Sequence, residues 1–580
     1  MKKNITLRGL LCLLLAMALL MGMVACGSDP APTTQPSQNM QASQPTTQAT
    51  QPTTQATQPT TAFNPPTTVL PTTAAPTEPP KPTPEPLVYT LIQEDVDLYY
   101  SLLENCETLS IEGLDMEAIE AASEALDAQY EYLNEQYSIA NILYYCDSYS
   151  TELKQQYLDT VDICTAANDA YIQMARRVYL SDSPAKDMLF EGWTEEDIAM
   201  LLAYDEQIAQ LRARNEEITV EYNSARKDDL KMQLYIEFVQ NNNEIAQFYG
   251  YSNYYEYAYD MAYDRDYGME DLVLIRQYAK EYLAPVFDTA LRNFYNSFYG
   301  LPQADQTTVS DFLYKDYNKV RKDYVGLYLE ALPEEMADTF EYMITMDSTF
   351  TSSKRAKAGA FTTMVGDRSY CYFGPGYGNS LTVVHEAGHY YASRHTALNS
   401  IPLDLAEVHS QGNEWLFVAF LDGQMTSTHY KALIDYRLYS DLAMIMICLM
   451  VDEFEQMVYT RDLTGYTPAD FNALMESVAT QYFDMKYIND NLTDIQNYWR
   501  MVVVDQPAYY ISYAVSSIAA IDLYTLARKD FNGAVAVYQK LCEEVDVENG
   551  FLGNLNNAGL AGPFDEEFYQ EIVQIISDRA

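Results

Sequence analysis

Apolar side chains recur every three or four residues along most of the chain after residue 95. The pattern is most regular over residues 116–146 and 195–225, where charged side chains fill the positions between the apolar ones. A period of about 3.6 residues predicts long amphipathic helices, which we expect to pair in antiparallel fashion. Breakers separate further helical segments, but no Pro/Ser-rich linker interrupts them: Gly250, Pro285, Pro302, Pro333 and Gly465. We therefore predict one large, predominantly all-α domain over residues 89–580.

The periodicity changes in the segment AFTTMVGDRSYCYFGPGYGNS, residues 360–380. Thr, Val, Tyr, Cys and Phe alternate there between glycine and proline, which is typical of one or two short strands. An irregular loop is the alternative. The free edge of a short strand can pair with an extended peptide, so a small β element at this place would have a use in binding.

The first 88 residues show no such periodicity. Residues 1–25 combine a basic start with an apolar run that ends at small residues, which is the pattern of an export signal. The sequence MVAC closes the run and resembles the lipobox of bacterial lipoproteins, in which Cys26 would be lipidated and become the new N-terminus. A plain signal peptide or an uncleaved membrane helix is the alternative. We expect a lipid-anchored protein at the outer, extracellular face of a bacterial cell membrane.

Residues 26–88 are predicted to form a tether behind this lipidated cysteine. Thr, Pro, Gln and Ala dominate the segment, and QPTTQAT occurs twice in it. Such a composition cannot bury enough apolar surface to offset its conformational entropy, so it indicates a disordered tether that holds the domain away from the membrane. A low-complexity binding segment is the alternative.

Charge and cysteine content exclude some function classes. The sequence holds 35 Lys and Arg against 83 Asp and Glu, a formal net charge of −48. Phosphate backbones would be repelled, so we expect no nucleic-acid partner. The excess of acidic residues is typical of a solvated surface, and attraction of cationic peptides is the alternative. The six cysteines after Cys26 lack C-x-x-C spacing, which favours isolated buried thiols over disulfides or a thiolate metal site.

The strongest chemical signal is the sequence HEAGH in a segment that is predicted to be helical. His385 and His389 are four residues apart, so both imidazoles lie on one face of a helix and can hold one zinc ion. Glu386 follows the first histidine and can act as general base on the attacking water. Asn379 or Ser380 is placed to cap this helix. Catalytic zinc needs a third protein ligand.

Two residues compete for that place. His395 has the spacing of H-E-x-x-H-x-x-G-x-x-H, but Ala392 replaces the glycine and disfavours the required left-handed turn by roughly 1 kcal/mol. We expect Ala392 to keep the helix running, so that His395 points away. Glu407 lies in a second predicted helix, residues 401–421, which can turn back and present its carboxylate to the metal. His409 would point elsewhere, in a second shell or at the surface, and His429 is expected to be structural.

HEAGH followed by AEVHSQGNEW resembles the thimet oligopeptidase and oligoendopeptidase F family of zinc peptidases. In that family the glutamate of an E-x-x-S segment is the third zinc ligand. The residues that fit the pattern are Glu407, Ser410, Glu414 and Trp415. Residues 250–267 and 507–517 resemble family segments before and after the site. The resemblance implies a helical clamshell with a deep substrate channel, one Zn²⁺ per chain, and cleavage of short unstructured peptides.

The same resemblance implicates Tyr509, Tyr510 and Tyr513 as hydrogen-bond donors to the tetrahedral oxyanion. Tyr510 and Tyr513 are three apart on a predicted helix and would share a face. The chain has 51 tyrosines, so a packing role for any one of them is the alternative. Members of the family commonly carry a histidine shortly before this segment, whereas Val502 lies near that position here.

The sequence therefore predicts a membrane-tethered zinc oligopeptidase. One alternative, motivated by the missing histidine, is a zinc-containing peptide-binding lipoprotein with little or no turnover. Glu386 argues against it, because a binding protein has no need for a general base. A second alternative is a three-histidine metzincin-type protease. Such a protease would have a mixed α/β catalytic domain, whereas the sequence on both sides of HEAGH is predicted to be helical.

Overall fold

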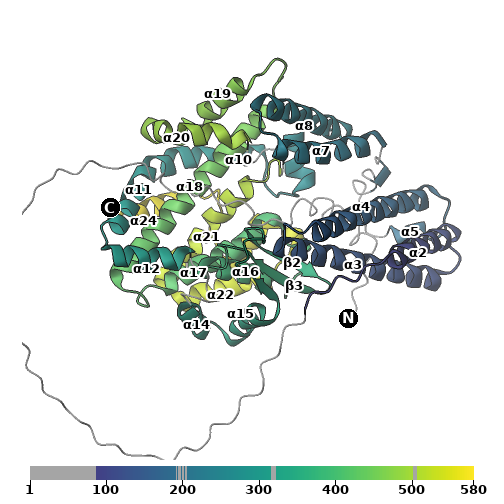
Figure 1. Cartoon of the computed structure of the whole chain (residues 1–580), viewed down its shortest axis with the longest axis horizontal. Helices are drawn as coiled ribbons and strands as arrows, with labels where there is room; N and C mark the ends of the chain where they lie inside the picture. The colour runs from purple at the N-terminus through teal and green to yellow at the C-terminus, as the bar shows by residue number, and fades with distance from the viewer. Residues whose placement is uncertain are drawn as a thin grey trace, which may run out of the picture.

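A computed structural model describes residues 86–580, except 191–192, 194–197, 199–200, 203–205, 315–321, 501–503, 505 and 580. The predicted signal peptide, Cys26, the tether up to residue 85, and Val502 lie outside the described residues. Among the helices that are described, none has both the length and the hydropathy to cross a bilayer. The fold is predominantly helical with one small sheet, as predicted (Figure 1).

The first helices form a separate bundle, here called the N-terminal arm, which extends to the right of the body in Figure 1. It consists of α2 (Gln93–Glu112), α3 (Met116–Cys146), α4 (Thr151–Leu180) and α5 (Lys186–Leu189). The predicted helix 116–146 is thus confirmed. The arm has its own apolar core, in which Tyr99, Leu133 and Tyr171 are buried, and the hydroxyl of Tyr99 donates to Ala167 O at 2.8 Å.

The body contains all the later helices around one continuous apolar core. Before the sheet these are α7 (Glu206–Ser224), α8 (Asp228–Phe248), α9 (Tyr254–Tyr257), η1 (Ala258–Ala262), α10 (Met269–Tyr278), η2 (Ala279–Leu283), α11 (Ala284–Tyr299), α12 (Gln303–Tyr314), α14 (Lys322–Ala331) and α15 (Glu334–Met346). Helix α7 lies within the predicted helix 195–225, of which several residues lie outside the described part.

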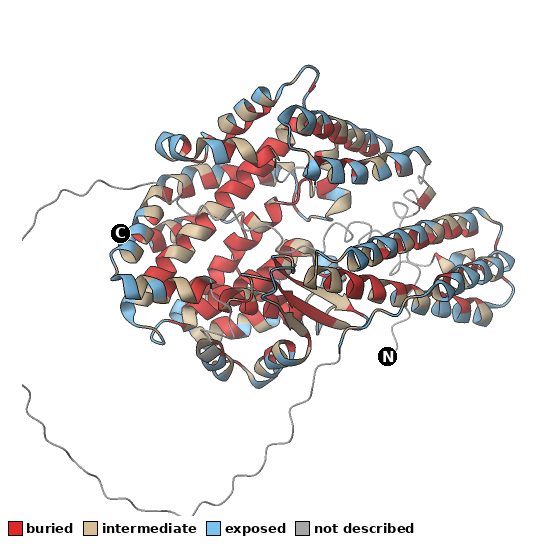
Figure 2. Cartoon of the chain, in the orientation of Figure 1, coloured by how far each residue is buried: buried red, intermediate tan, exposed pale blue. Residues whose placement is uncertain are grey.

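After the sheet come α16 (Ser380–Ala392), η3 (Leu398–Ser400), α17 (Leu403–Phe420), α18 (Ser427–Tyr459), α19 (Pro468–Ala479), α20 (Met485–Asn497), η4 (Tyr498–Arg500), α21 (Ile511–Lys529), α22 (Phe531–Glu543), η5 (Val547–Asn549), α23 (Gly550–Ala558) and α24 (Glu566–Ser577). Figure 2 shows that buried positions concentrate in the middle of the body, along α18 and α21. The six described cysteines are free, five of them buried and Cys146 partly buried.

The sheet has three strands in the order β1-β3-β2. The strands are β1 (Ser348–Phe350), β2 (Ala360–Val365) and β3 (Arg368–Phe373). Strand β3 pairs with β1 in parallel and with β2 in antiparallel fashion, so β2 is an edge strand. The prediction of one or two short strands in residues 360–380 is confirmed by β2 and β3. Strand β1 was not predicted, because three residues are too few to show alternation. Side chains of β2 and β3 pack on α3, which joins the arm to the body.

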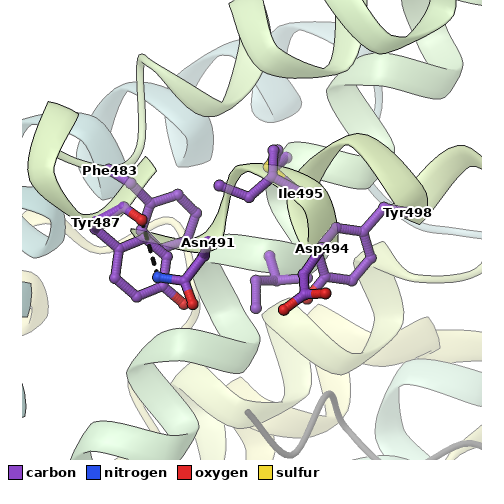
Figure 3. Close-up of a pocket in the computed structure, with 8 residues that line it drawn as sticks. Phe483, Tyr487, Asn491, Asp494, Ile495 and Tyr498 are labelled. Atoms are coloured by element: carbon purple, nitrogen blue, oxygen red, sulfur yellow. Dashed lines mark hydrogen bonds between the residues drawn. The ribbon is translucent and has the colours of Figure 1, made fainter. Parts of the chain in front are cut away.

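A small cavity lies beside α20 (Figure 3). Its volume is about 10 Å³, the space of about one water molecule. Asn491 leaves helical geometry here, with φ −122° and ψ 16°, and its Nδ2 donates to Tyr487 O at 2.8 Å. The cavity therefore accompanies a kink in the helix and is too small for an organic ligand.

Candidate metal centre

Helix α16 carries HEAGH and begins where the sequence predicts. The side chain of Asn379 accepts hydrogen bonds from the backbone N–H groups of Leu381 and Thr382, both at 3.1 Å. This cap satisfies two of the donors that a helix start leaves unpaired. The helix is buried along most of its length, which fixes the histidines against the rest of the body.

The end of α16 corrects one prediction. Ala392 does not keep the helix running, because the helix ends at that residue. The chain then tightens into a turn in which the N–H of His395 donates to Ala392 O, three residues back, at 3.0 Å. The Ser393 hydroxyl donates to Tyr390 O at 2.7 Å and occupies one of the last helical carbonyls. His395 is exposed, and its ring packs on Tyr391 with centroids 5.1 Å apart.

Helix α17 crosses α16 in close backbone contact. A Cβ atom at Gly388 would lie 2.3 Å from His409 O, so the glycine of HEAGH is what lets the two backbones touch. Asn413 fixes the same pair of helices, because its Nδ2 donates to Val384 O at 2.7 Å. These contacts bring Glu407 of α17 to the histidines of α16.

The three predicted ligands lie together. One ligand atom each of His385, His389 and Glu407 falls within 4.8 Å of the other two. Two imidazoles and one carboxylate are the donor set of catalytic zinc sites. His389 Nε2 is buried and makes no hydrogen bond within the described residues, which would be costly unless a metal ion takes its lone pair. The residues present therefore fit a zinc ion.

Electrostatics also suit His389 to this role. Burial lowers the pKa of His389 well below its usual value, and the neighbouring His385 and His409 lower it further. The imidazole is therefore neutral at physiological pH. A neutral imidazole is the form that binds a metal ion.

A carboxylate orients the other histidine. His385 Nδ1 donates to Glu414 Oε1 at 2.7 Å, and Arg437 Nη1 donates to Glu414 Oε2 at 2.5 Å. Burial raises the pKa of Glu414, but the charge of Arg437 and the hydrogen bond from His385 outweigh it, so the net pKa is lowered and the group is a carboxylate. With Nδ1 engaged, Nε2 of His385 is left for a metal ion. Arg437 is held in turn by Asp441, whose Oδ1 lies 3.0 Å from Nε.

Sequence reasoning included Glu414 in the family pattern but gave it no role. A signal was present, because Glu414 follows Glu407 by seven residues and two helical turns place both on one face. Arg437 was missed. It lies on α18, and no local pattern links it to α17.

Glu386 is buried between α16 and the sheet. Its Oε2 accepts a hydrogen bond from Thr362 Oγ1 at 2.7 Å, and Thr362 belongs to the edge strand β2. Burial raises the pKa of Glu386 to about 7, although the charge of His385 and the Thr362 hydrogen bond oppose the rise. A carboxyl group with a pKa near neutrality can accept and return a proton.

Two other histidines have structural partners. His409 is fully buried, which excludes the surface position that was one of its two expected places, and its Nε2 donates to Leu541 O of α22 at 3.1 Å. Burial lowers the pKa of His409 to about 4. His429 Nε2 lies 3.0 Å from Asp305 Oδ1, which joins α18 to α12. Ser410 of the E-x-x-S pattern places its hydroxyl 3.4 Å from Glu407 Oε2.

The predicted tyrosines lie at the start of α21, a helix that packs along α17. Ser517 of α21 donates to Gln411 Oε1 of α17 at 2.6 Å. Tyr509 is buried, whereas Tyr510 and Tyr513 are partly buried. The rings of Tyr510 and Tyr513 have centroids 6.1 Å apart, as expected for two side chains on one helix face.

Comparisons with known proteins identify the fold. No protein-family model and no curated protein sequence matches the chain. PZ peptidase A, solved with an inhibitor, is similar with a TM-score of 0.62 and 18% identity, covering 86% of this chain and 98% of its own. Oligoendopeptidase-F from Enterococcus faecium is similar with a TM-score of 0.52 and 13% identity, covering 84% of this chain and 97% of its own. The predicted resemblance is confirmed at the level of the fold.

Proposed function

We propose that this chain is a zinc-dependent oligopeptidase that hydrolyses peptide bonds in short, unstructured peptides. One observation carries the proposal: ligand atoms of His385, His389 and Glu407 converge to within 4.8 Å, and the buried Glu386 lies on the same helix as the two histidines. The likeness of the fold to PZ peptidase A and oligoendopeptidase-F, both peptidases by name, supports the same class of reaction.

The residues divide the chemistry among them. A bound zinc ion would supply Lewis-acid chemistry, by polarising the scissile carbonyl and lowering the pKa of water. His385, His389 and Glu407 would hold the ion and leave one coordination position open. Glu386 would take the proton of the attacking water and pass it to the leaving amine.

Two further features would act on the substrate. A peptide that paired with the edge strand β2 would lie beside Thr362 and therefore beside Glu386. Tyr510 and Tyr513 would donate hydrogen bonds to the oxyanion of the tetrahedral intermediate. A deep channel between helical lobes would admit short peptides and exclude folded proteins.

We also propose that the enzyme works outside the cell, on a lipid anchor at Cys26. The basic and apolar start of the chain and the lipobox-like MVAC support this proposal. Fractionation of the producing cells would test it. We expect the unmodified protein in the membrane fraction and Cys26→Ala outside it, whereas an unchanged distribution of Cys26→Ala would contradict the lipid anchor.

A peptide-binding protein with little or no turnover is the second candidate. Val502, near the position where related peptidases commonly carry a histidine, favours it. The buried carboxyl group of Glu386, which follows the first histidine of HEAGH, favours the enzyme.

Cleavage of a mixed peptide library by the full-length, zinc-loaded protein in detergent separates the two. We expect cleavage that chelators abolish and zinc restores, and a fall in kcat of at least about a hundredfold in Glu386→Gln with zinc still bound. Glu335→Gln, at an exposed position on α15, is the matched control and should retain full activity. Peptides that are bound but never cut would favour the binding protein.

A further inference from the structure

A buried arginine touches both the helix that carries Glu407 and the helix that carries the tyrosines. The side chain of Arg265 is 1% exposed. Its Nη2 donates to Ser512 Oγ at 2.9 Å, in the first turn of α21. Its Nε lies 3.6 Å from Asp404 Oδ2, in the first turn of α17 and one turn before Glu407. One guanidinium group thus contacts the first turns of both α17 and α21.

The guanidinium group is held on several sides. Its central carbon lies 4.3 Å from the ring centroid of Tyr259 and 4.4 Å from that of Tyr263. Tyr267 donates to Asp404 Oδ2 at 2.7 Å, which fixes the carboxylate partner. A planar guanidinium group between two rings and a carboxylate has one well-defined position, which the flexible ammonium group of a lysine cannot reproduce.

The segment that precedes α21 is strained. Ala508 has φ +61°, a left-handed conformation that costs a residue with a Cβ atom roughly 1 kcal/mol or more. Such a conformation persists only where the surroundings enforce it. The N–H of Ala508 donates to the buried carboxyl group of Glu455, at 3.2 Å to Oε2, and Tyr263 donates to Pro507 O at 3.0 Å. Residues 507–513 are here called the tyrosine segment.

The partner segment is strained as well. Asp264, next to Arg265, has φ +46°. Backbone strain therefore occurs on both sides of the contact between residues 263–267 and the tyrosine segment. A region that needed only to be stable would not require two such positions, so the contact points to a demand for accurate placement.

We infer that Arg265 is a positioning residue, which sets the tyrosine segment at a fixed place relative to α17 and the metal centre. The inference rests on the proposed function, because it assumes that Tyr510 and Tyr513 assist the peptidase reaction. Small displacements of groups that act on a transition state cost large factors in rate, whereas a side chain that only holds the fold changes stability.

Arg265→Lys tests the inference, with Arg276→Lys as its matched control. Arg276 is also buried, its side chain being 7% exposed, and it pairs with Asp452 and Tyr255. Its hydrogen-bond partners among the described residues are Tyr255, Asp452 and Gln456, which lie on α9 and α18 and not on α17 or α21. Both substitutions should lower the melting temperature, but Arg265→Lys alone should lower kcat, by about tenfold or more, with KM within about twofold and bound zinc unchanged.

A double-mutant cycle separates placement of the tyrosines from other effects. In a Tyr510→Phe, Tyr513→Phe background, Arg265→Lys should lower kcat no further, because the groups it positions are gone. Ser512→Ala removes one hydrogen bond and keeps the buried ion pair, so it still tests the inference if Arg265→Lys folds poorly. It should give a smaller fall in kcat with the same non-additivity.

The outcomes distinguish the inference from the proposed function. An unmodified protein that cuts no peptide overturns the proposed function and this inference with it. An active unmodified protein whose Arg265→Lys and Ser512→Ala variants keep full kcat overturns the inference alone. Effects of Arg265→Lys that multiply with those of the tyrosine substitutions would also overturn it.

Discussion

Helices α4 and α17 bury their side chains in different ways. On α4 the buried positions form one stripe at helical spacing: Thr160, Cys164, Ala167, Asn168, Tyr171, Met174, Ala175 and Val178. On α17 every residue from 407 to 418 is buried, whichever way it points. Figure 2 shows the same contrast between the N-terminal arm, blue along its outer side, and the red centre of the body.

The difference between the two helices indicates which of them contributes to the functional site. A striped helix buries mainly apolar side chains on one face, and its charged residues stay in contact with water. A helix that is buried all round must give each polar side chain a partner, and on α17 these partners come from other helices: Val384 O for Asn413, Ser517 for Gln411 and Leu541 O for His409. Buried polar groups are costly and are kept where they serve a site. Substitutions on α17 should therefore change metal binding or rate, and those in the arm only stability.

The largest expected effect is at Glu407. Glu407→Ala removes one of the three groups that we propose to hold zinc, so bound zinc and peptidase activity should both be lost. Zinc per chain, measured by atomic emission after gel filtration, checks this. His395→Ala is the control, because His395 is exposed and should keep both properties. Loss of zinc in the histidine variant with retention in the glutamate variant would reverse the ligand assignment.

Gly388→Ala comes next. The new Cβ would meet His409 O at 2.3 Å, so α16 and α17 must separate and Glu407 moves away from the histidines. We expect a loss of about 2 kcal/mol in the free energy of unfolding together with weaker zinc binding. Gly326→Ala on α14 is the matched control, since nothing lies within 4 Å of its Cβ, and it should stabilise slightly. Unchanged zinc affinity in Gly388→Ala would show that the close approach does not place Glu407.

Part of the fold and of the metal centre could be predicted from the sequence, and part could not. Local patterns were sufficient for the bounds of α3, the Asn379 cap and strands β2 and β3, because each depends on neighbours in the chain. The pairing of Glu407 with HEAGH came from spacing and family resemblance. The partners Arg437 and Arg265 could not be predicted, because they join helices that meet only in the folded protein.

The end of α16 was not predicted correctly from helix propensity. Ala392 has no Cβ conflict with a helix, so propensity alone predicts that the helix continues. The helix ends instead where the Ser393 hydroxyl donates to Tyr390 O and the N–H groups of the next two residues donate to carbonyl groups three residues back. The expected direction of His395, away from the metal, was reached for the wrong reason.

Glu414→Gln should have a smaller effect on the metal centre. The amide cannot match the carboxylate as acceptor for His385 Nδ1, so zinc affinity should fall about tenfold to hundredfold while the ion still binds. Competition with a chelator of known affinity measures this. Glu335→Gln again serves as the control. Zinc affinity equal to that of the unmodified protein would mean that the Glu414 hydrogen bond does not orient the ligand.

The smallest expected effect lies in the arm, at Ser150. The Ser150 hydroxyl accepts from the N–H of Leu153 at 3.2 Å and caps α4, so Ser150→Ala should cost about 1 kcal/mol in the free energy of unfolding. We expect kcat and bound zinc to stay unchanged. The result is not trivial, because α3 packs on β2, whose Thr362 donates to Glu386. A fall in kcat at full zinc occupancy would mean that the arm acts through β2 on Glu386, the proposed general base. Substitutions in the arm would then not affect stability alone.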